Sequence, residues 1–232
     1  NGENPGLGWG KGDASSLYGW YTMLVYITPI IGGILADKLL GFRKAIIIGA
    51  VLMTLGHLSL AFHPIPMFYL GLLLLIIGNG FFKPNISSIV GQLYPENSEK
   101  KDSGYTIFYQ GINVGAFLGS ILCGYLGEIY GWHYGFGLAG VFMLIGLIQF
   151  KLSEHMFGEI GLAPTKTEKT EGIREKENAP LTKIEKDRLI VVGVLAFFSI
   201  FFWAAFEQAG SSMTIFASEN TDRALNGSAI IT

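Results

Sequence analysis

Two ionisable residues stand inside long uncharged stretches, where a charge is expensive. Lys83 lies in residues 80–85, Gly-Phe-Phe-Lys-Pro-Asn, and Glu207 lies in residues 203–208, Trp-Ala-Ala-Phe-Glu-Gln. A charge within the hydrocarbon of a membrane costs about 2.5 to 3.5 kcal/mol on insertion scales, so residues of this kind usually have a function. Burial and a nearby cation shift the proton affinity of a carboxylate in opposite directions. A carboxylate that exchanges its cationic partner can therefore take up and release a proton.

Three further residues are candidates for a ligand site. Asn113 stands in the middle of an apolar stretch, where an asparagine either binds a ligand or hydrogen-bonds another helix. Tyr26 and Trp203 also lie well inside apolar stretches, where packing is the simpler role. For Lys83 and Glu207, the structural alternatives are a buried ion pair with each other or a lysine whose amine reaches the interface.

Six apolar stretches position these residues, and each is long enough to cross a bilayer. A membrane helix needs about 20 apolar residues. The chain is 50% hydrophobic and only 15% charged, whereas soluble domains carry about 25% charge. The sequence therefore predicts an all-α, polytopic membrane protein, and a bundle of buried soluble helices is the alternative. The predicted transmembrane helices are 14–37, 45–62, 67–94, 103–128, 133–152 and 188–217.

The distribution of Lys and Arg orients these helices. Of the 16 basic residues, 13 fall on one side of the predicted spans, which the positive-inside rule places in the cytoplasm. Residues 153–187 hold 14 of the 34 charged residues and are expected to be a solvated cytoplasmic linker. Both ends look cut, so we expect a fragment of a longer protein. The predicted segments are a periplasmic loop (1–13), five helices of a first bundle (14–152), the linker (153–187), the first helix of a second bundle (188–217) and a periplasmic loop (218–232).

Composition argues against several function classes. A net charge of −2 offers no broad basic surface for nucleic acid. The single cysteine, Cys123, excludes an internal disulfide framework and a cysteine-based zinc site, and we expect no metal. An enzyme is disfavoured, because the four histidines are scattered and four intramembrane serines have no histidine or aspartate at suitable spacing in their helices: Ser87, Ser88, Ser211 and Ser212. A membrane enzyme and a non-transporting sensor stay as alternatives from another class.

Glycine spacing marks one helix face. Gly111, Gly115 and Gly119 repeat every four residues and so form a stripe along the fourth predicted span. Small residues let membrane helices approach closely. We therefore expect tight helix packing along this stripe, and no chemistry.

The turn after the first span carries a recognisable pattern. Residues 32–44 resemble the cytoplasmic loop between the second and third helices of the major facilitator superfamily. The glycines permit a close helix approach and a tight turn, the aspartate pairs with a base or caps a neighbouring helix, and the basic residues hold the loop inside. The residues of this motif are Gly33, Asp37, Gly41, Arg43 and Lys44.

Three further motifs, at residues 80–85, 108–117 and 202–212, narrow the resemblance. Together they resemble the proton-dependent oligopeptide transporter family in its bacterial branch. The resemblance implies a partial major facilitator superfamily fold, in which the six spans are the second to seventh helices and the missing helices of the same protein are partners. It also implies symport of di- and tripeptides by alternating access across the bacterial inner membrane, with protons as the coupling ion and no cofactor.

The resemblance assigns a role to each candidate. Lys83 interacts with the peptide carboxylate and with gating carboxylates, and Asn113 hydrogen-bonds the peptide backbone. Tyr26 and Trp203 line the side-chain pocket. Glu207 is linked to proton coupling and to a salt bridge that closes the outer gate.

The chain lacks the first helix of this family, with its Glu-x-x-Glu-Arg signature, and the helices after the seventh. Relatives of the family have diverged in substrate, so nitrate or an amino acid is the alternative solute.

Overall fold

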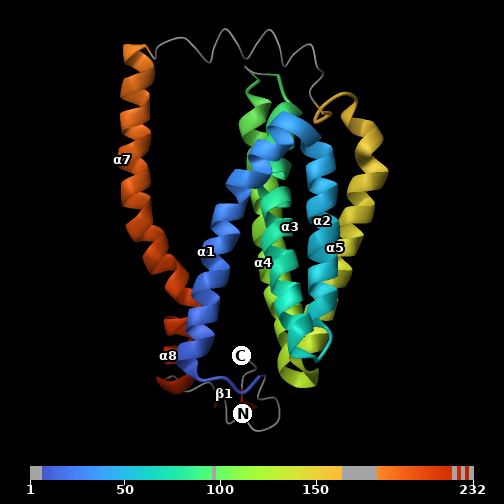
Figure 1. Ribbon diagram of the computed structural model, residues 1–232, viewed down its shortest axis with the longest axis vertical. Helices are drawn as coiled ribbons and strands as arrows, with labels where there is room; N and C mark the ends of the chain where they lie inside the picture. Colours follow the sequence, from blue (N-terminus) through green and yellow to red (C-terminus); the bar gives the residue numbers. More distant parts are fainter. Residues whose placement is uncertain (1–6, 96–97, 164–181, 221–223, 226–227, 230–232) are drawn as a thin grey trace. The chain divides into compact units, whose positions relative to one another are not determined.

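The computed structural model describes residues 7–95, 98–163, 182–220, 224–225 and 228–229. Long helices joined by short turns make up almost all of this part of the chain (Figure 1). The first five helices are α1 (Lys11–Leu35), α2 (Phe42–Leu60), α3 (Ile65–Gln92), α4 (Lys100–Tyr130) and α5 (Trp132–Ser153). The π-helix η1 (Ala36–Leu40) follows α1, and the 3-10 helix η2 (Glu154–Phe157) follows α5. Farther along lie α7 (Lys183–Phe206), η3 (Glu207–Gly210), α8 (Ser212–Asn220) and two short antiparallel strands, β1 (Ala224–Leu225) and β2 (Ser228–Ala229).

The predicted all-α polytopic fold is confirmed. Among the described residues, six helical runs are long and apolar enough to cross a membrane. Each contains most of one predicted span. The runs are Lys11–Leu40, Phe42–Leu60, Ile65–Gln92, Lys100–Tyr130, Trp132–Phe157 and Lys183–Gly210.

The described residues group into two units. The first contains residues 7–10 and 19–163, which include most of α1 and the whole of α2 to α5. The second contains residues 11–18 of α1 together with α7, η3, α8 and the strands.

Helix α2 is the centre of the first unit, because it packs against both α3 and α5, while α4 packs against α5 (Figure 1). The backbones of α2 and α3 meet at glycines. A methyl group on Gly49 of α2 would lie 2.7 Å from the Gly78 carbonyl oxygen of α3 and 2.7 Å from the Phe82 nitrogen. Only glycine leaves room for this approach, which is how helices associate closely in a membrane.

The start of α2 is held by the turn that follows α5. The Arg43 Nε donates to the Ile160 carbonyl and its Nη2 donates to the Gly158 carbonyl, both at 2.5 Å. The Arg43 backbone N–H donates to the Gly161 carbonyl at 3.0 Å. The guanidinium also lies over the Phe157 ring, 5.7 Å from its centroid, and Arg43 is only 6% exposed. Residues 157–161, at the start of the expected solvated linker, therefore contact α2, although Met156 and Leu162 on either side are exposed. Residues 164–181 of the linker lie outside the described residues.

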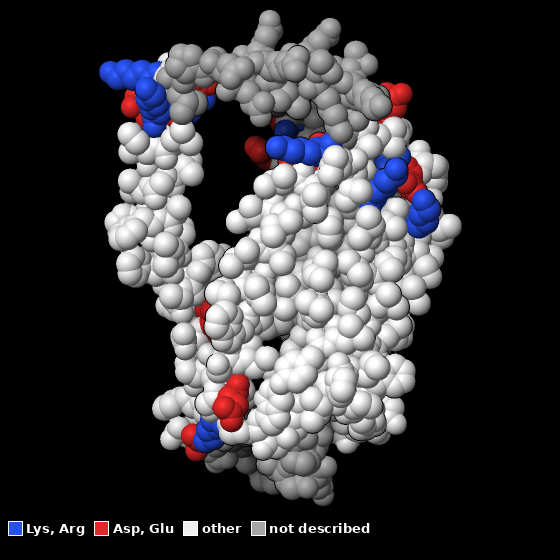
Figure 2. All heavy atoms as spheres, in the orientation of Figure 1, with Lys and Arg blue, Asp and Glu red and all other residues white. Residues whose placement is uncertain are grey.

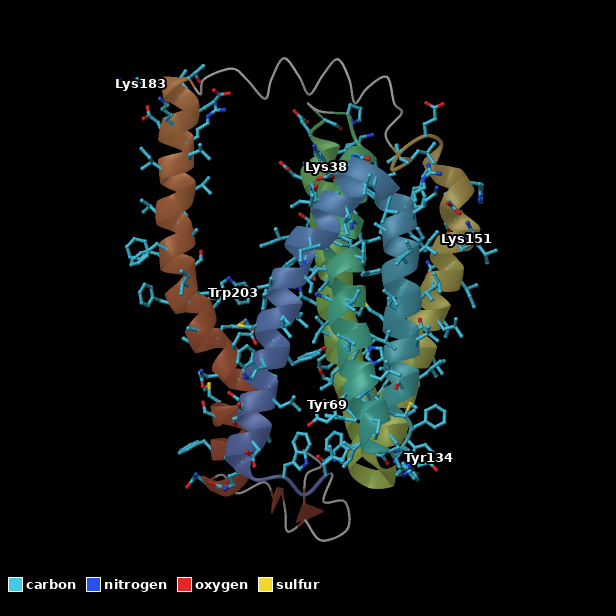
Figure 3. The ribbon with its side chains drawn as sticks, viewed as in Figure 1. Lys38, Tyr69, Tyr134, Lys151, Lys183 and Trp203 are labelled. Carbon is cyan, nitrogen blue, oxygen red and sulfur yellow. The ribbon has the colours of Figure 1, made fainter. Side chains whose placement is uncertain are left out.

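The two ends of the first unit differ in chemistry. On the face shown in Figure 2, the charged side chains of the first unit gather at one end of its helices, and the middle of the helices is uncharged. Lys38 and Lys151 lie at one end, and Tyr69 and Tyr134 lie at the opposite end (Figure 3). Lysine and tyrosine are residues that anchor helices at membrane interfaces. The two lysines share an end, as the orientation predicted from the basic residues requires.

Helix α7 begins at Lys183, five residues before the predicted start. Thr182 and Glu185 form a capping box: the Thr182 N–H donates to Glu185 Oε2 at 2.8 Å, and the Glu185 N–H donates to Thr182 Oγ1 at 3.3 Å. Such a box satisfies backbone donors at a helix start. The Thr-x-x-Glu spacing was the available signal for this boundary.

The expected single helix over 188–217 is interrupted. Helix α7 ends at Phe206, η3 covers Glu207–Gly210, and Ser211 leaves the helical region with φ −133° and ψ −94°. Glycine weakens a helix, and serine offers the backbone competing hydrogen bonds. The glycine followed by two serines in residues 210–212 is therefore the physical reason for the interruption.

The tight packing expected along the α4 glycine stripe is not found among the described residues. An added methyl group at Gly111, Gly115 or Gly119 meets nothing within 4 Å. The spacing correctly places these glycines on one helix, but the described part of the chain puts no other helix against them.

Candidate functional site

The candidate site in the first unit begins at a proline. Pro84 lies inside α3 and has no N–H, so the Gly80 carbonyl lacks its usual helical donor. Helix α1 packs against this point, because a methyl group on Gly32 would overlap the Gly80 carbonyl. The close approach predicted for Gly33 is thus made by its neighbour Gly32. At Gly33 itself, an added methyl group would meet Pro84 at an ordinary 4.0 Å.

Two hydrogen bonds fix α1 on α3 beside this contact. The Thr28 hydroxyl donates to the Ile76 carbonyl at 2.9 Å, and the Asn79 amide donates to the Val25 carbonyl at 3.0 Å. Polar side chains commonly link membrane helices in this way. Sequence reasoning assigned no role to Thr28 or Asn79, although a polar residue in an apolar stretch is the signal for such a link.

These contacts bring two candidates together. The Lys83 amine lies over the Tyr26 ring, 5.1 Å from its centroid, which is within the range of a cation–π interaction. Tyr26 immediately follows Val25, and Lys83 lies one helical turn after Asn79, so the two hydrogen bonds set the position of this pair. Lys83 is exposed and Tyr26 is 46% exposed, so a solute can reach the amine and the ring in this chain.

Asn85 is a buried residue of the same motif that sequence reasoning left without a role. It is 1% exposed, and its amide nitrogen donates to the Phe81 carbonyl at 2.7 Å. Among the described residues, nothing hydrogen-bonds its Oδ1. This bond returns to the α3 backbone just before Pro84, where the helix ladder is interrupted.

Asn113 lies on α4 and is exposed. Its amide nitrogen donates to the Tyr109 carbonyl, one turn earlier in the same helix, at 2.9 Å. The side chain therefore keeps its carbonyl oxygen available as an acceptor. The role of Asn113 as a peptide ligand stays a prediction.

The loop motif is divided between exposed and buried residues. Gly41 has φ +76° and makes the tight turn that was predicted, in a conformation that L side chains rarely adopt. Asp37 and Lys44 are exposed, whereas Arg43 is buried in the turn after α5. Arg43 therefore does more than hold a loop on one side, because it joins α2 to the end of α5.

In the second unit, Glu207 stands where α7 changes to η3 and is partly buried. The Tyr18 hydroxyl donates to Glu207 Oε2 at 3.2 Å. Trp203 lies one turn earlier on α7 (Figure 3), is 47% exposed, and packs edge-on against Phe206 with ring centroids 5.3 Å apart. Tyr18 was not among the predicted site residues, and no motif in the sequence singles it out.

The interruption of the helix after Glu207 is bridged by side chains. The Gln208 amide nitrogen donates to the Ala204 carbonyl at 3.3 Å, and the Ser212 hydroxyl donates to Gln208 Oε1 at 2.6 Å. The Ser211 backbone N–H donates to the Gln208 carbonyl at 3.1 Å. Gln208 thus connects α7 with α8, and the turn that carries Glu207 has a defined shape.

Comparison with known proteins identifies the family. Residues 43–172 match the model of the POT family, which is more than half of the chain. The chain belongs to the POT family. It is 38% identical over 165 residues to a di-/tripeptide transporter of Lactococcus lactis, covering 70% of this chain and 33% of that protein. It is 30% identical to the peptide transporter YePEPT of Yersinia enterocolitica, covering 96% of this chain and 55% of that protein.

A solved structure supports the same fold. A mutant of a peptide transporter POT in complex with alafosfalin superposes with a TM-score of 0.76 at 30% sequence identity, covering 91% of this chain and 53% of that one. The chain thus spans about a third to a half of the length of these relatives. This POT-family chain is a multi-pass inner-membrane protein, and its relatives are transporters rather than enzymes. Among the described residues, no group of three or more His, Cys, Asp or Glu is placed to hold a metal ion.

Proposed function

We propose that this POT-family chain forms part of a proton-coupled symporter of di- and tripeptides that works by alternating access. The observation that carries the proposal is the Lys83 amine over the Tyr26 ring, 5.1 Å from its centroid, inside a membrane helix pair. A charged lysine within a membrane-spanning segment costs free energy, so such residues usually have a function. The names of the relatives, which are peptide transporters, support the substrate class.

Peptides share a backbone and two charged ends but differ in their side chains. A fixed amine attracts the terminal carboxylate, and an amide side chain such as that of Asn113 pairs with the peptide backbone. Aromatic rings accept varied side chains by contact alone, which is the role proposed for Tyr26 and Trp203. This set of groups recognises what all short peptides have in common and tolerates what differs.

Proton coupling is assigned to Glu207. Within transporters of this superfamily, two halves rock around a central site. A carboxylate at the interrupted end of α7 loses its charge when it binds a proton, so its interactions with neighbouring groups change with its protonation state. Peptide binding at Lys83 and proton binding at Glu207 together then favour the rearrangement that releases both on the inside.

Uptake of a labelled dipeptide into proteoliposomes tests the proposal. The complete protein is reconstituted, an inward proton gradient is imposed, and wild type is compared with Lys83→Ala and Glu207→Gln. Both substitutions are expected to reduce gradient-driven uptake at least about tenfold, corresponding to a loss of about 1.4 kcal/mol. Lys151→Ala and Glu154→Gln are matched controls, because these residues pair with each other in an exposed bridge and are expected to change little.

The outcomes separate the parts of the proposal. Absence of dipeptide uptake by folded wild-type protein contradicts the peptide assignment, and nitrate and amino acids are then tested. Uptake that retains its proton dependence in Glu207→Gln keeps the substrate class and moves the proton site elsewhere. Binding of peptide without flux indicates a sensor.

A further inference from the structure

Within the second unit, residues 11–18 of α1 meet the interrupted end of α7 at a tyrosine. The Tyr18 hydroxyl donates to Glu207 Oε2 at 3.2 Å, and both side chains are partly buried. A tyrosine hydroxyl is a donor whose position is set by its ring, which has few rotatable bonds. The position of the ring therefore decides whether the Glu207 carboxylate has this donor.

Gly210 provides the space for that ring. It is the last residue of η3, and a methyl group there would lie 2.6 Å from Tyr18 Cζ and 3.2 Å from Cε2. These distances are shorter than normal contacts between carbon atoms. The glycine that helps to interrupt the helix also allows Tyr18 to reach the carboxylate three residues earlier.

An ion pair joins the same two parts of the unit. Lys11, at the start of α1, pairs with Glu219 of α8. The described charged residues of α1, η3 and α8 are Lys11 and Asp13 on α1, Glu207 on η3, and Glu219 on α8. Lys11 is thus engaged with Glu219, while Tyr18 donates to Glu207.

We propose that Tyr18 is a positioning residue for proton coupling, whose hydroxyl holds the Glu207 carboxylate and releases it when the carboxylate is protonated. Hydrogen bonds to an ionised acceptor are roughly twice as strong as those between neutral groups. Proton binding to the carboxylate therefore weakens the attachment of residues 11–18 of α1 to the end of α7. This inference rests on the function proposed above.

Tyr18→Phe tests the role, because it keeps the ring and removes only the hydroxyl. Reconstituted complete protein is assayed for gradient-driven dipeptide uptake over a range of pH. The pH of half-maximal uptake is expected to shift by about one unit, since the variant lacks the hydrogen bond that the hydroxyl makes to the carboxylate. Peptide exchange without a gradient is expected to stay within about twofold of wild type. Tyr130→Phe, at an exposed tyrosine that ends α4, is the matched control.

Gly210→Ala is a second and independent variant. Its methyl group displaces the Tyr18 ring, so it is expected to shift the pH profile in the same direction. Gly193→Ala, on α7, is the control, because a methyl group there meets nothing within 4 Å. A protein that carries both Tyr18→Phe and Gly210→Ala is expected to show the same shift as the single variant with the larger effect. The two effects do not add, because both substitutions act through one hydrogen bond.

The results distinguish this inference from the proposed function. An unchanged pH midpoint in Tyr18→Phe, with uptake and exchange either normal or reduced equally, overturns the positioning role. If Tyr18→Phe does not fold, an unchanged midpoint in Gly210→Ala overturns it instead. Wild-type protein that takes up no peptide contradicts the proposed function and not the Tyr18 contact.

Discussion

Helices α2 and α4 are both glycine-containing membrane helices, but the described chain surrounds only one of them. Within an apolar stretch of 18 residues, 50% of the α2 residues are buried, against 6% of the α4 residues. The α2 glycines face backbone atoms of α3, whereas Gly111, Gly115 and Gly119 of α4 face open space. Glycine spacing therefore marks a face on which a helix is able to pack, and the presence of a partner decides whether it does.

The largest expected effect is at the start of α2. Arg43→Met removes the donors to the Ile160 and Gly158 carbonyls while keeping an apolar side chain of similar length. Each of these partly buried hydrogen bonds has a charged donor, and such bonds contribute about 1.5 to 3 kcal/mol. We expect a loss of about 3 kcal/mol in the free energy of unfolding, measured by denaturant titration in detergent.

Lys44→Met is the matched control for Arg43→Met. Lys44 is the adjacent residue, carries the same charge and is exposed, so its substitution is expected to cost less than about 0.5 kcal/mol. Equal effects of the two substitutions would show that the charge matters and that the hydrogen bonds to the turn after α5 do not.

The next effect is at the contact between α2 and α3. Gly49→Ala places a methyl group 2.7 Å from both the Gly78 carbonyl oxygen and the Phe82 nitrogen. Backbone atoms are unable to rotate away, so the helices must separate, and overpacking of this kind costs about 1 to 3 kcal/mol. A lower unfolding midpoint of the purified protein is the expected result, and an unchanged midpoint would mean that the two helices are not in contact here.

A smaller effect is expected where α1 crosses α3. Thr28→Val keeps the shape of the side chain and removes the hydrogen bond to the Ile76 carbonyl. Hydrogen bonds between membrane helices average about 0.6 kcal/mol. Thr54→Val is the control, because the Thr54 hydroxyl donates within its own helix to the Ala50 carbonyl at 2.8 Å. The difference in melting temperature between the two variants measures how much a hydrogen bond between helices adds to stability, compared with one inside a helix.

Sequence reasoning located the spans because length and apolar character are local properties. It also selected Lys83 and Glu207, since a charged residue in an apolar stretch can be recognised without knowing which residues surround it in the fold. The contact of Lys83 with Tyr26 was not predictable in this way, because it depends on Gly32, Thr28 and residues of another helix at the crossing. Spacing along one chain segment does not specify which helix lies opposite.

The ends of elements were predicted less well, for related reasons. The capping box at Thr182 is local and was available in the sequence, but the charged composition of the linker obscured it. The interruption at Glu207–Gly210 is also local, in the glycine and serines that follow Glu207, but the apolar pattern favoured one continuous helix. The hydrogen bond from Tyr18 joins residues 189 positions apart, and only the folded chain brings them together.

The smallest expected effect is at the α4 stripe, and it sharpens the comparison with α2. Gly115→Ala adds the same methyl group as Gly49→Ala but meets nothing within 4 Å. In this chain alone we expect a change of less than about 0.5 kcal/mol in the free energy of unfolding, as at other open positions. A loss comparable to that of Gly49→Ala would show that α4 packs on something that the described residues do not contain. If the loss appears only in the complete protein, the covering surface belongs to a segment outside this chain, because the added methyl group is identical in both experiments.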